Sequence, residues 1–374
     1  MDDLNDSILM HFAGIIEIRQ ECKIKHDLME IIFIVLVCTI AGCNDWQDIE
    51  LFAKEREDWF RKHIELPNGL PSHDTLERVF RWIEPKQFEK CFICWTNEFK
   101  LLKDRQTIAI DGKTCRGSSD KSIDRSAIHM VSAWACENGL ILGQVKTAEK
   151  SNEITAIPEL LDLISVKNNI ITIDAMGTQK DIAKKIIEKK GDYVLALKGN
   201  QSTLQTDVID YFKFAISEHF KDIDYKYYRT LDKGHGRVEK RKYYLINDLN
   251  WLNNKENWLG LKGIGMVEST VMKGESQTVE TRYFITSLTG TAEEFGNSVR
   301  NHWGIESMHW MLDVVFKEDK NHVRKDFAPQ NLAVLRRIAL NILKKDTSIK
   351  KSLKIKRFKA ALNLDYLTHM VFDF

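Results

Sequence analysis

Two aspartates, Asp111 and Asp174, have the residue type and the setting for metal-dependent chemistry. Each directly follows a short β-favouring run, 107–110 or 170–173, so each is predicted to stand at the end of a strand. If the strands are parallel neighbours, both carboxylates emerge at the same sheet edge, where α/β proteins usually bind their ligands. Carboxylates suit Mg²⁺, and two such ions about 3.5–4 Å apart can stabilise the attacking and the leaving oxygen of a phosphodiester. The alternative is that both aspartates only form turns.

A predicted helix over residues 300–313 carries a further polar stripe. Its polar members recur at steps of four, three and four residues, which places them on one face: His302, Glu306, His309 and Asp313. An amphipathic helix with a solvated face explains this pattern without any chemistry. From spacing alone, Asp313, Glu318 and Asp319 are as available as Glu306 for the role of a third acidic ligand.

Basic residues that could contact a phosphate backbone are local, because the net charge of the chain is only +1. One run, Lys344 to Lys359, holds eight Lys or Arg against one acid, and another spans Lys233 to Lys242. Either run is equally well explained as a solvated face. Alternating residues of a predicted strand would share one face: His235, Arg237, Glu239 and Arg241. Lys198, in the turn after another strand, is either a phosphate contact or an ordinary loop lysine.

Composition excludes several classes of protein. The 374 residues, 29% charged and 43% hydrophobic, are typical of a globular protein larger than one ordinary domain. Seven scattered cysteines predict reduced thiols and a cytoplasmic location, and Cys91 and Cys94 are predicted to be helix core. The longest apolar run, residues 31–43, is too short to span a bilayer and predicts a buried helix. No P-loop, G-x-G-x-x-G, G-x-S-x-G or H-E-x-x-H motif is present, and Ser72-His73-Asp74 is interpreted as a loop and helix cap.

The elements that must position these residues follow from hydrophobic periodicity. Residues up to about 100 predict helices, one of them opened by Asp74 with Glu77 as a capping box. After the strand at 107–110, runs at 128–136 and 140–145 flank Asn138-Gly139, a strong hairpin signal. A helix at 152–164, the strand at 170–173, a helix capped by Thr178 and a strand at 193–197 complete the order βββαβαβ, which predicts an α/β layer. Residues 225–288 predict a β-rich insertion with a turn at 273–275, and helices follow from about residue 293.

Several long segments, in order and nearly from end to end, resemble the ISAs-type insertion-sequence transposases, whose relatives include the H-repeat-associated proteins. The segments that carry the resemblance are LPNGLPSHDTLERVF, AIDGKTCRGS, KSNEITAIPELL, TIDAMGTQKDIA, ALKGNQ, GHGRVEKR and RNHWGIESMHWMLDVVFKED with APQNLAVLRRIALNILK. The resemblance implies an RNase H-like catalytic core of the DDE class. It also implies that the metal-binding acids are Asp111 in DGKT, Asp174 in IDAMGTQ and Glu306 in HWGIES.

The resemblance implies four regions. A helical N-terminal associated domain, for which DNA binding is one interpretation, covers residues 1–100, and the first part of the α/β RNase H-like core covers 101–205. The β-rich insertion covers 206–288, and residues 289–374 complete the core with the helix of Glu306 and basic C-terminal helices. The 131 residues between Asp174 and Glu306 leave room for this insertion.

One departure from the wider group of insertion-sequence transposases concerns the surroundings of Glu306. That group carries Tyr, Arg and Lys at minus seven, minus four and plus seven from the glutamate, where this chain has Val299, His302 and Asp313. Asp313 inverts the expected charge, so DNA contacts at these positions do not carry over. Arg300 is the hypothetical substitute.

The function expected from the resemblance is DNA strand cleavage at element ends and strand transfer into target DNA. Two Mg²⁺ (or Mn²⁺) ions are the expected cofactors, double-stranded DNA with terminal inverted repeats the expected partner, and a homodimer the expected synaptic assembly, with no membrane involved. The hypothetical DNA contacts are Lys198, His235, Arg237, Arg241, Arg300, His302 and His309. The alternatives are a domesticated DNA-binding relative that no longer transposes and an RNase H-like nuclease without strand transfer.

Overall fold

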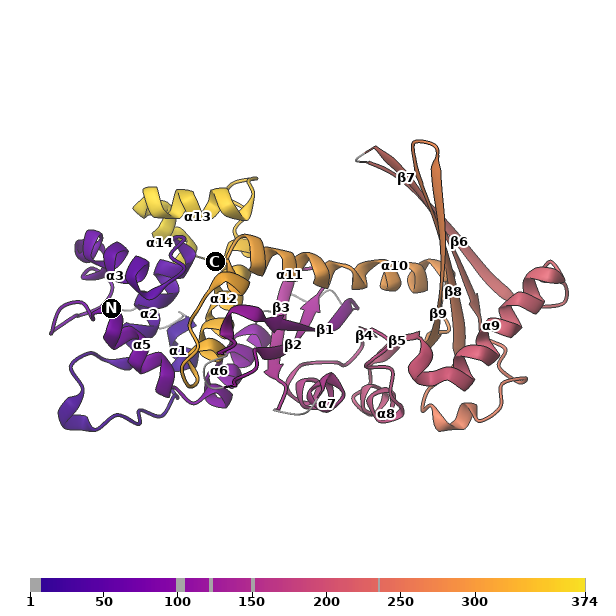
Figure 1. Ribbon diagram of the computed structural model, residues 1–374, viewed down its shortest axis with the longest axis horizontal. Coiled ribbons are helices and arrows are strands. Elements are labelled where there is room, and N and C mark those ends of the chain that lie inside the picture. Colours follow the sequence, from indigo (N-terminus) through magenta and orange to yellow (C-terminus); the bar gives the residue numbers. More distant parts are fainter. Residues whose placement is uncertain (1–7, 99–104, 121–123, 149–151, 235, 374) are drawn as a thin grey trace.

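The computed structural model describes residues 8–98, 105–120, 124–148, 152–234 and 236–373. The molecule is elongated, with a helical unit at one end and long β-hairpins at the other (Figure 1). His235, one of the predicted DNA contacts, lies outside the described residues. No helix within the described ranges is both long and apolar enough to cross a membrane.

The first part of the chain is helical, as predicted. Its helices are α1 (Ile8–Phe12), η2 (Glu21–Lys23), α2 (Leu28–Ile40), α3 (Trp46–Glu55), α4 (Glu57–Phe60), α5 (His73–Trp82) and α6 (Pro85–Glu98). The apolar run forms the buried helix α2, which Asp27 caps by accepting from the backbone N–H groups of Met29 and Glu30. Helix α5 begins one residue earlier than the prediction that Asp74 opens it, because the hydroxyl of Ser72 accepts from the N–H of Thr75 and caps the helix.

The cysteine predictions are confirmed in part. All seven thiols are free, as expected for reduced cysteines. On α6, Cys91 is half-buried, whereas Cys94 is exposed, so the prediction that both belong to the helix core is wrong for Cys94. The helix buries a different face, which carries Phe88, Phe92 and Trp95.

The α/β core follows the predicted order βββαβαβ. Its elements are β1 (Thr107–Cys115), η3 (Arg116–Ser118), β2 (Ile128–Ala135), β3 (Leu140–Lys146), α7 (Glu153–Leu163), β4 (Ile170–Ile173), α8 (Lys180–Glu188) and β5 (Asp192–Leu197). In space the strands lie in the order β3-β2-β1-β4-β5. Strands β1, β4 and β5 are parallel to one another, whereas β2 is antiparallel to both of its neighbours, β1 and β3. The predicted hairpin joins β2 to β3, and Gly139 adopts the positive φ of 67° that its turn requires. The sheet therefore has the expected RNase H-like arrangement.

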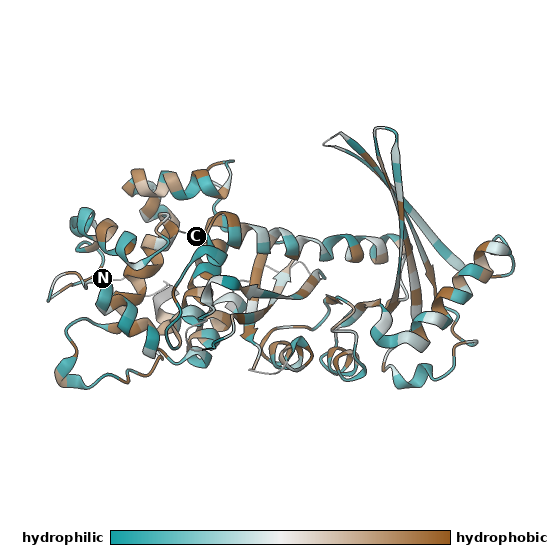
Figure 2. Cartoon of the chain, in the orientation of Figure 1, coloured by the Kyte–Doolittle hydropathy of each residue, from teal (hydrophilic) through white to brown (hydrophobic). Residues whose placement is uncertain are grey.

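The β-rich segment continues this sheet. After η5 (Gly199–Gln201) and α9 (Ser202–Ser217) come β6 (Tyr225–Gly234), β7 (Arg237–Ile246), η6 (Lys255–Asn257), β8 (Gly263–Lys273) and β9 (Ser276–Thr286). Strand β9 pairs with β5, so one nine-stranded sheet runs through both parts. The predicted turn at 273–275 joins β8 to β9. The far ends of these hairpins are largely hydrophilic, whereas α2 is almost uniformly hydrophobic (Figure 2).

Helices cover both faces of the core sheet. Helices α7 and α8 lie on one face, and α10 (Ala292–His302) and α11 (Gly304–Val314) lie on the other (Figure 1). The helix predicted over residues 300–313 is in fact two helices that meet at Trp303. Asn152 caps α7, whereas Thr178, the predicted cap of α8, does not cap it. Its hydroxyl donates instead to the carbonyls of Asp174 (3.1 Å) and Ala196 (2.6 Å), which ties the end of β4 to β5.

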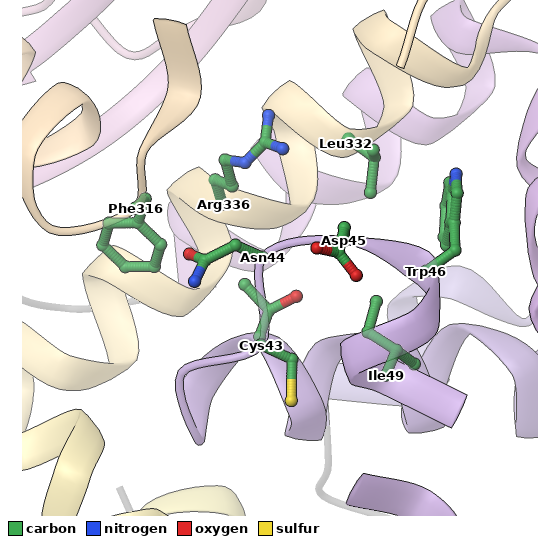
Figure 3. Close-up of a pocket in the computed structure, with 9 residues that line it drawn as sticks. Cys43, Asn44, Asp45, Trp46, Ile49, Phe316, Leu332 and Arg336 are labelled. Atoms are coloured by element: carbon green, nitrogen blue, oxygen red, sulfur yellow. The ribbon is translucent and has the colours of Figure 1, made fainter. Parts of the chain in front are cut away.

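The last helices join the helical unit to the sheet. After η7 (Glu318–Lys320) come α12 (Ala328–Lys345), α13 (Leu353–Leu362) and α14 (Leu364–Phe372), and α12 is buried along nearly all of its length. The amide of Asn341 on α12 accepts from the N–H (2.9 Å) and donates to the carbonyl (2.8 Å) of Ile141, so the edge strand β3 keeps its hydrogen bonds. Where α12 meets the turn before α3, Arg336 and Phe316 face Asn44 and Asp45 around a cavity of about 10 Å³ (Figure 3). Such a space has room for about one water molecule.

The basic run from Lys344 to Lys359 is only partly a surface feature. Lys356 and Arg357 are buried, and both bind backbone carbonyls. Arg357 donates to the carbonyl of Thr39 at the end of α2 (2.8 Å) and stacks on the ring of Phe316 (4.4 Å). These two cations therefore hold the C-terminal helices to the rest of the molecule instead of facing a nucleic acid.

Candidate active site

Asp111 and Asp174 occupy adjacent positions on neighbouring parallel strands. The parallel ladder between β1 and β4 ends with the pair Ile110 and Ile173, so Asp111 is the next residue of β1 and Asp174 directly follows the end of β4. The sequence predicted that this strand ends at Asp111. Strand β1 continues instead, because β2 pairs with it as far as Cys115. Asp111 therefore lies inside a strand, which fixes its backbone more firmly than a loop would.

The side chain of Asp174 is oriented by the turn that follows β4. Its Oδ1 accepts from the backbone N–H groups of Met176 (3.0 Å) and Gly177 (3.1 Å). Burial raises the pKa of Asp174, although these two N–H groups and the positive charge of Lys198 act in the opposite direction. Lys198, exposed in the loop after β5, is thus within electrostatic reach of this carboxylate.

Helix α11 brings Glu306 to the same place. Glu306 lies in the first turn of the helix and is exposed, and α11 packs on β1. One turn later, Nδ1 of His309 lies 3.8 Å from Oδ2 of Asp111. The structure thus brings together Asp111, Asp174, Glu306 and His309 from three elements.

Negative charge accumulates at this centre, where Lys198 is a cation that acts on Asp174. Burial, followed by the charge of Glu153 and by those of Asp174 and Glu306, raises the pKa of Asp111 to about 7. His309 does not compensate, because burial and the nearby charges of Arg337 and Lys113 lower its pKa to about 4 and leave it neutral. In the part of the chain that the structure describes, no three acidic, histidine or cysteine side chains lie close enough together to hold a metal ion as they stand. Crowded carboxylates with hard oxygen donors nevertheless fit a divalent cation such as Mg²⁺.

Asp313, the unusual neighbour of Glu306, has a partner inside the protein. The ammonium of Lys113, two residues after Asp111, lies 2.7 Å from Asp313, 3.0 Å from Asp319 and 3.3 Å from Glu318. Glu318 in turn pairs with the buried Arg337 of α12 at 2.9 Å. We call these five residues the Lys113 cluster. Burial by itself would raise the pKa of Glu318. The positive charges of Arg337, Lys113 and Arg336 outweigh burial and lower this pKa to about 2, so the carboxylate of Glu318 stays charged.

His302 also points into the protein. Its Nδ1 lies 3.0 Å from the hydroxyl of Thr172 on β4. Burial, with the charge of Arg282, lowers the pKa of His302 to about 4, so the ring is neutral at pH 7. This position ties α10 to the sheet and gives no support to the prediction that His302 contacts DNA.

A basic pocket lies between α10 and strands β7, β8 and β9. Its volume is about 250 Å³, and among its lining residues are Arg237, Arg300 and Arg282, whose guanidinium stacks 4.5 Å from the ring centre of Trp303. Arg241 lines it too but is buried and paired with Asp232 (2.5 Å) and Glu239. Three of the predicted DNA contacts line this pocket, and two of them, Arg237 and Arg300, are exposed.

Two residues near the centre were missed from the sequence. Glu153, the first residue of α7, is buried and acts on Asp111 more strongly than Asp174 or Glu306 does. Lys113 is the centre of the ion cluster. Both lie in motifs that the resemblance had marked, KSNEI and DGKT, but nothing in their spacing shows which residues they meet.

Comparisons with known proteins identify the family to which the chain belongs. Residues 9–96 match the family described as DDE_Tnp_1-associated, and residues 102–342 match the family described as Transposase DDE domain. The chain is 44% identical over 370 residues to "Putative transposase YncI" of Escherichia coli O157:H7, covering 98% of this chain and 94% of that protein. It is 39% identical over 371 residues to "H repeat-associated putative transposase YhhI" of Escherichia coli K12, covering 97% of each.

Among solved structures, the piggyBac transposase synaptic complex with hairpin DNA aligns with 98% of this chain and 79% of that one. The TM-score is 0.44 and the identity 10%.

The Lys113 cluster predicts an uneven response to charge removal. Lys113→Met leaves buried carboxylates facing one another, so we expect it to lower the free energy of unfolding by about 3–5 kcal/mol. Asp313→Asn keeps the other two partners and should cost only about 1–2 kcal/mol. Urea denaturation measures both. The control is Lys242→Met, which breaks a half-exposed pair with Glu268 (2.7 Å) and should cost at most about 1 kcal/mol. Equal losses for Lys113→Met and Lys242→Met would contradict this account.

The raised pKa of Asp111 predicts a pH dependence in metal-free protein. The folded pKa of about 7 exceeds the ordinary value of 3.8, so the stability that the protonated carboxyl contributes is lost as pH rises from about 4 through 7. Asp111→Asn should therefore be more stable than the wild type at pH 8, on the order of 2 kcal/mol, and much closer to it at pH 4. Thermal unfolding in the presence of a chelator tests this, with Asp181→Asn on α8 as the control for loss of one exposed charge. A stability difference that does not grow with pH would refute the assignment.

Proposed function

This chain belongs to the family of the transposase DDE domain, and from that premise we propose that it cuts DNA at the ends of a mobile element and joins the freed ends to target DNA. The observation that carries the proposal is the meeting of Asp111, Asp174 and Glu306 at one edge of the sheet. Burial first, then the charge of Glu153 and then those of Asp174 and Glu306 raise the pKa of Asp111. Crowded carboxylates of this kind suit a centre that binds divalent cations.

The proposed reaction has two steps at phosphorus. Water attacks the phosphorus at the element end and the P–O3′ bond breaks, which leaves a 3′-hydroxyl on the element and a 5′-phosphate on the flank. The freed 3′-hydroxyl then attacks a phosphorus of the target DNA, and the 3′-oxygen of the target strand leaves as its own 3′-hydroxyl, without a covalent link to the protein. Two Mg²⁺ or Mn²⁺ ions bound by the three acids would activate the attacking oxygen and stabilise the leaving one.

Each acid has a role that its surroundings support. Asp111, fixed inside β1, would share the binding of metal with Asp174, and Glu306 would hold the second ion. Asp174 is held in one orientation by two backbone N–H groups, and Glu306 is presented by the first turn of α11. Lys198, close to Asp174 and exposed, is proposed to bind a phosphate of the strand that is cut.

The basic pocket is the proposed surface for duplex DNA outside the centre. Arg300 precedes Glu306 by six residues on the consecutive helices α10 and α11, so a strand bound at this pocket is close to the acids. Arg237 faces it from β7, and the guanidinium groups of both can bind phosphate with two hydrogen bonds. A homodimer that pairs two element ends is part of the proposal.

Substitution of the first acid tests the proposed reaction. Asp111→Asn should reduce Mg²⁺-dependent cleavage of a duplex with the element's inverted repeat by at least about a thousandfold, because it removes a carboxylate that would bind metal. Binding of that duplex should change less than about threefold. A gel assay of cleavage and strand-transfer products, with Asp181→Asn as the control, measures the effect. Retained cleavage by Asp111→Asn would exclude this site. Nicks without joined products would favour a nuclease, and binding without cleavage by the wild type would favour a domesticated relative.

Substitution at the basic pocket tests the DNA surface. Arg237→Ala and Arg300→Ala should each weaken duplex binding independently of sequence, and each should reduce the slope of log Kd against log salt by about 1. The control is Arg229→Ala on β6. Strand residues alternate between faces, and Arg229 pairs with Lys242, so it lies on the opposite face from the pocket. An equal effect of all three substitutions would show that the contacts are not specific to the pocket.

A further inference from the structure

Glu153 is a buried carboxylate beside the proposed metal centre. It is the first residue of α7, only 9% of its surface is exposed, and its Oε1 lies 2.8 Å from Nε2 of His129 on β2. Nδ1 of the same ring lies 2.9 Å from the hydroxyl of Thr114 on β1. In the tautomer that satisfies both contacts, the ring donates to Glu153 and accepts from Thr114, so the carboxylate is held in one orientation.

Gly112 shows how close this pair lies to the proposed metal centre. A Cβ atom on Gly112 would lie 2.1 Å from Oε1 of Glu153 and 2.2 Å from Nε2 of His129, so any larger residue would displace them. Gly112 directly follows Asp111 on β1. The absence of a side chain there lets Glu153 and His129 pack against the backbone next to the first acid.

The charge of Glu153 reaches both aspartates. It raises the pKa of Asp111 more than the charges of Asp174 and Glu306 do, and it also raises the pKa of Asp174. Helix α7 also packs against the turn that orients Asp174, because a Cβ atom on Gly177 would lie 2.8 Å from Cδ1 of Ile157, one turn after Glu153. Glu153 therefore approaches the two aspartates from the α7 face, opposite the α11 face that carries Glu306. His129 is the one side chain that hydrogen-bonds this carboxylate among the described contacts.

We propose that Glu153 is a fourth acidic side chain of the metal centre, oriented by His129 and Thr114 and contributing to the binding of an ion held between Asp111 and Asp174. The inference rests on the proposed function, since it presupposes a metal centre. It assigns Gly112 a specific task, which is to leave room for this carboxylate.

The test measures metal binding by the full chain without DNA. Mn²⁺ titration followed by electron paramagnetic resonance should show an affinity at least about tenfold lower for Glu153→Gln than for the wild type. Glu159→Gln is the matched control, because Glu159 lies on the same helix but is exposed beside Lys86 (3.6 Å). His129→Ala keeps the carboxylate but removes its partner and should give a smaller loss. Wild-type affinity in Glu153→Gln would overturn the proposal.

Thermal unfolding separates a metal-binding role from a structural one. If Glu153 belongs to the centre, Glu153→Gln should melt at or above the wild-type temperature without metal, because one repulsive charge is gone, and Mn²⁺ should stabilise it less. A lower melting temperature with an undiminished Mn²⁺ effect would show that Glu153 only supports His129. Asp111→Asn identifies the level of failure. If both Asp111→Asn and Glu153→Gln keep wild-type Mn²⁺ affinity, the proposed function fails. If Asp111→Asn loses affinity and Glu153→Gln keeps it, only the further inference fails.

Discussion

The ion pairs of Lys113 are the interaction on which the geometry of this site depends. Lys113 lies two residues after Asp111, on the same face of β1, and Asp313 lies seven residues, or about two turns, after Glu306 on α11. Their contact at 2.7 Å therefore fixes the strand of the first acid against the helix of the third. Through Glu318 and Arg337 the same cluster reaches α12, the helix that joins the sheet to the helical unit.

This arrangement separates two kinds of buried charge that lie close together. In the Lys113 cluster, cations and carboxylates are matched, and burial strengthens their attraction. At the neighbouring centre, Asp111, Asp174, Glu153 and Glu306 accumulate negative charge, while His309 remains neutral. Because Lys113 is already engaged by three carboxylates, it does not neutralise Asp111, and the centre remains available to a cation from solution.

One continuous sheet connects the acidic centre to the long hairpins. Pairing of β9 with β5 joins the long hairpins rigidly to the core, and α10 spans both before leading into α11. Arg300 and Glu306 thus belong to one helical arm, with the basic pocket at one end and the acids at the other. Several basic residues that look equivalent in the sequence are divided by this packing. Arg237 and Arg300 remain exposed, whereas Arg241, Lys356 and Arg357 hold the protein together.

The sequence by itself determined the order of helices and strands, because hydrophobic periodicity and turn residues such as Asn138-Gly139 encode local backbone structure. It also placed Asp111 and Asp174 side by side, since parallel strands end at a common edge. It could not choose among the acids near Glu306, detect Glu153, or recognise that β1 continues past Asp111. Those answers required tertiary structure, because they depend on partners far away in the chain: Lys113 is 200 residues from Asp313, and β2 supplies the hydrogen bonds that extend β1. Ion pairing and burial between distant segments are properties of packing, and no local pattern records them.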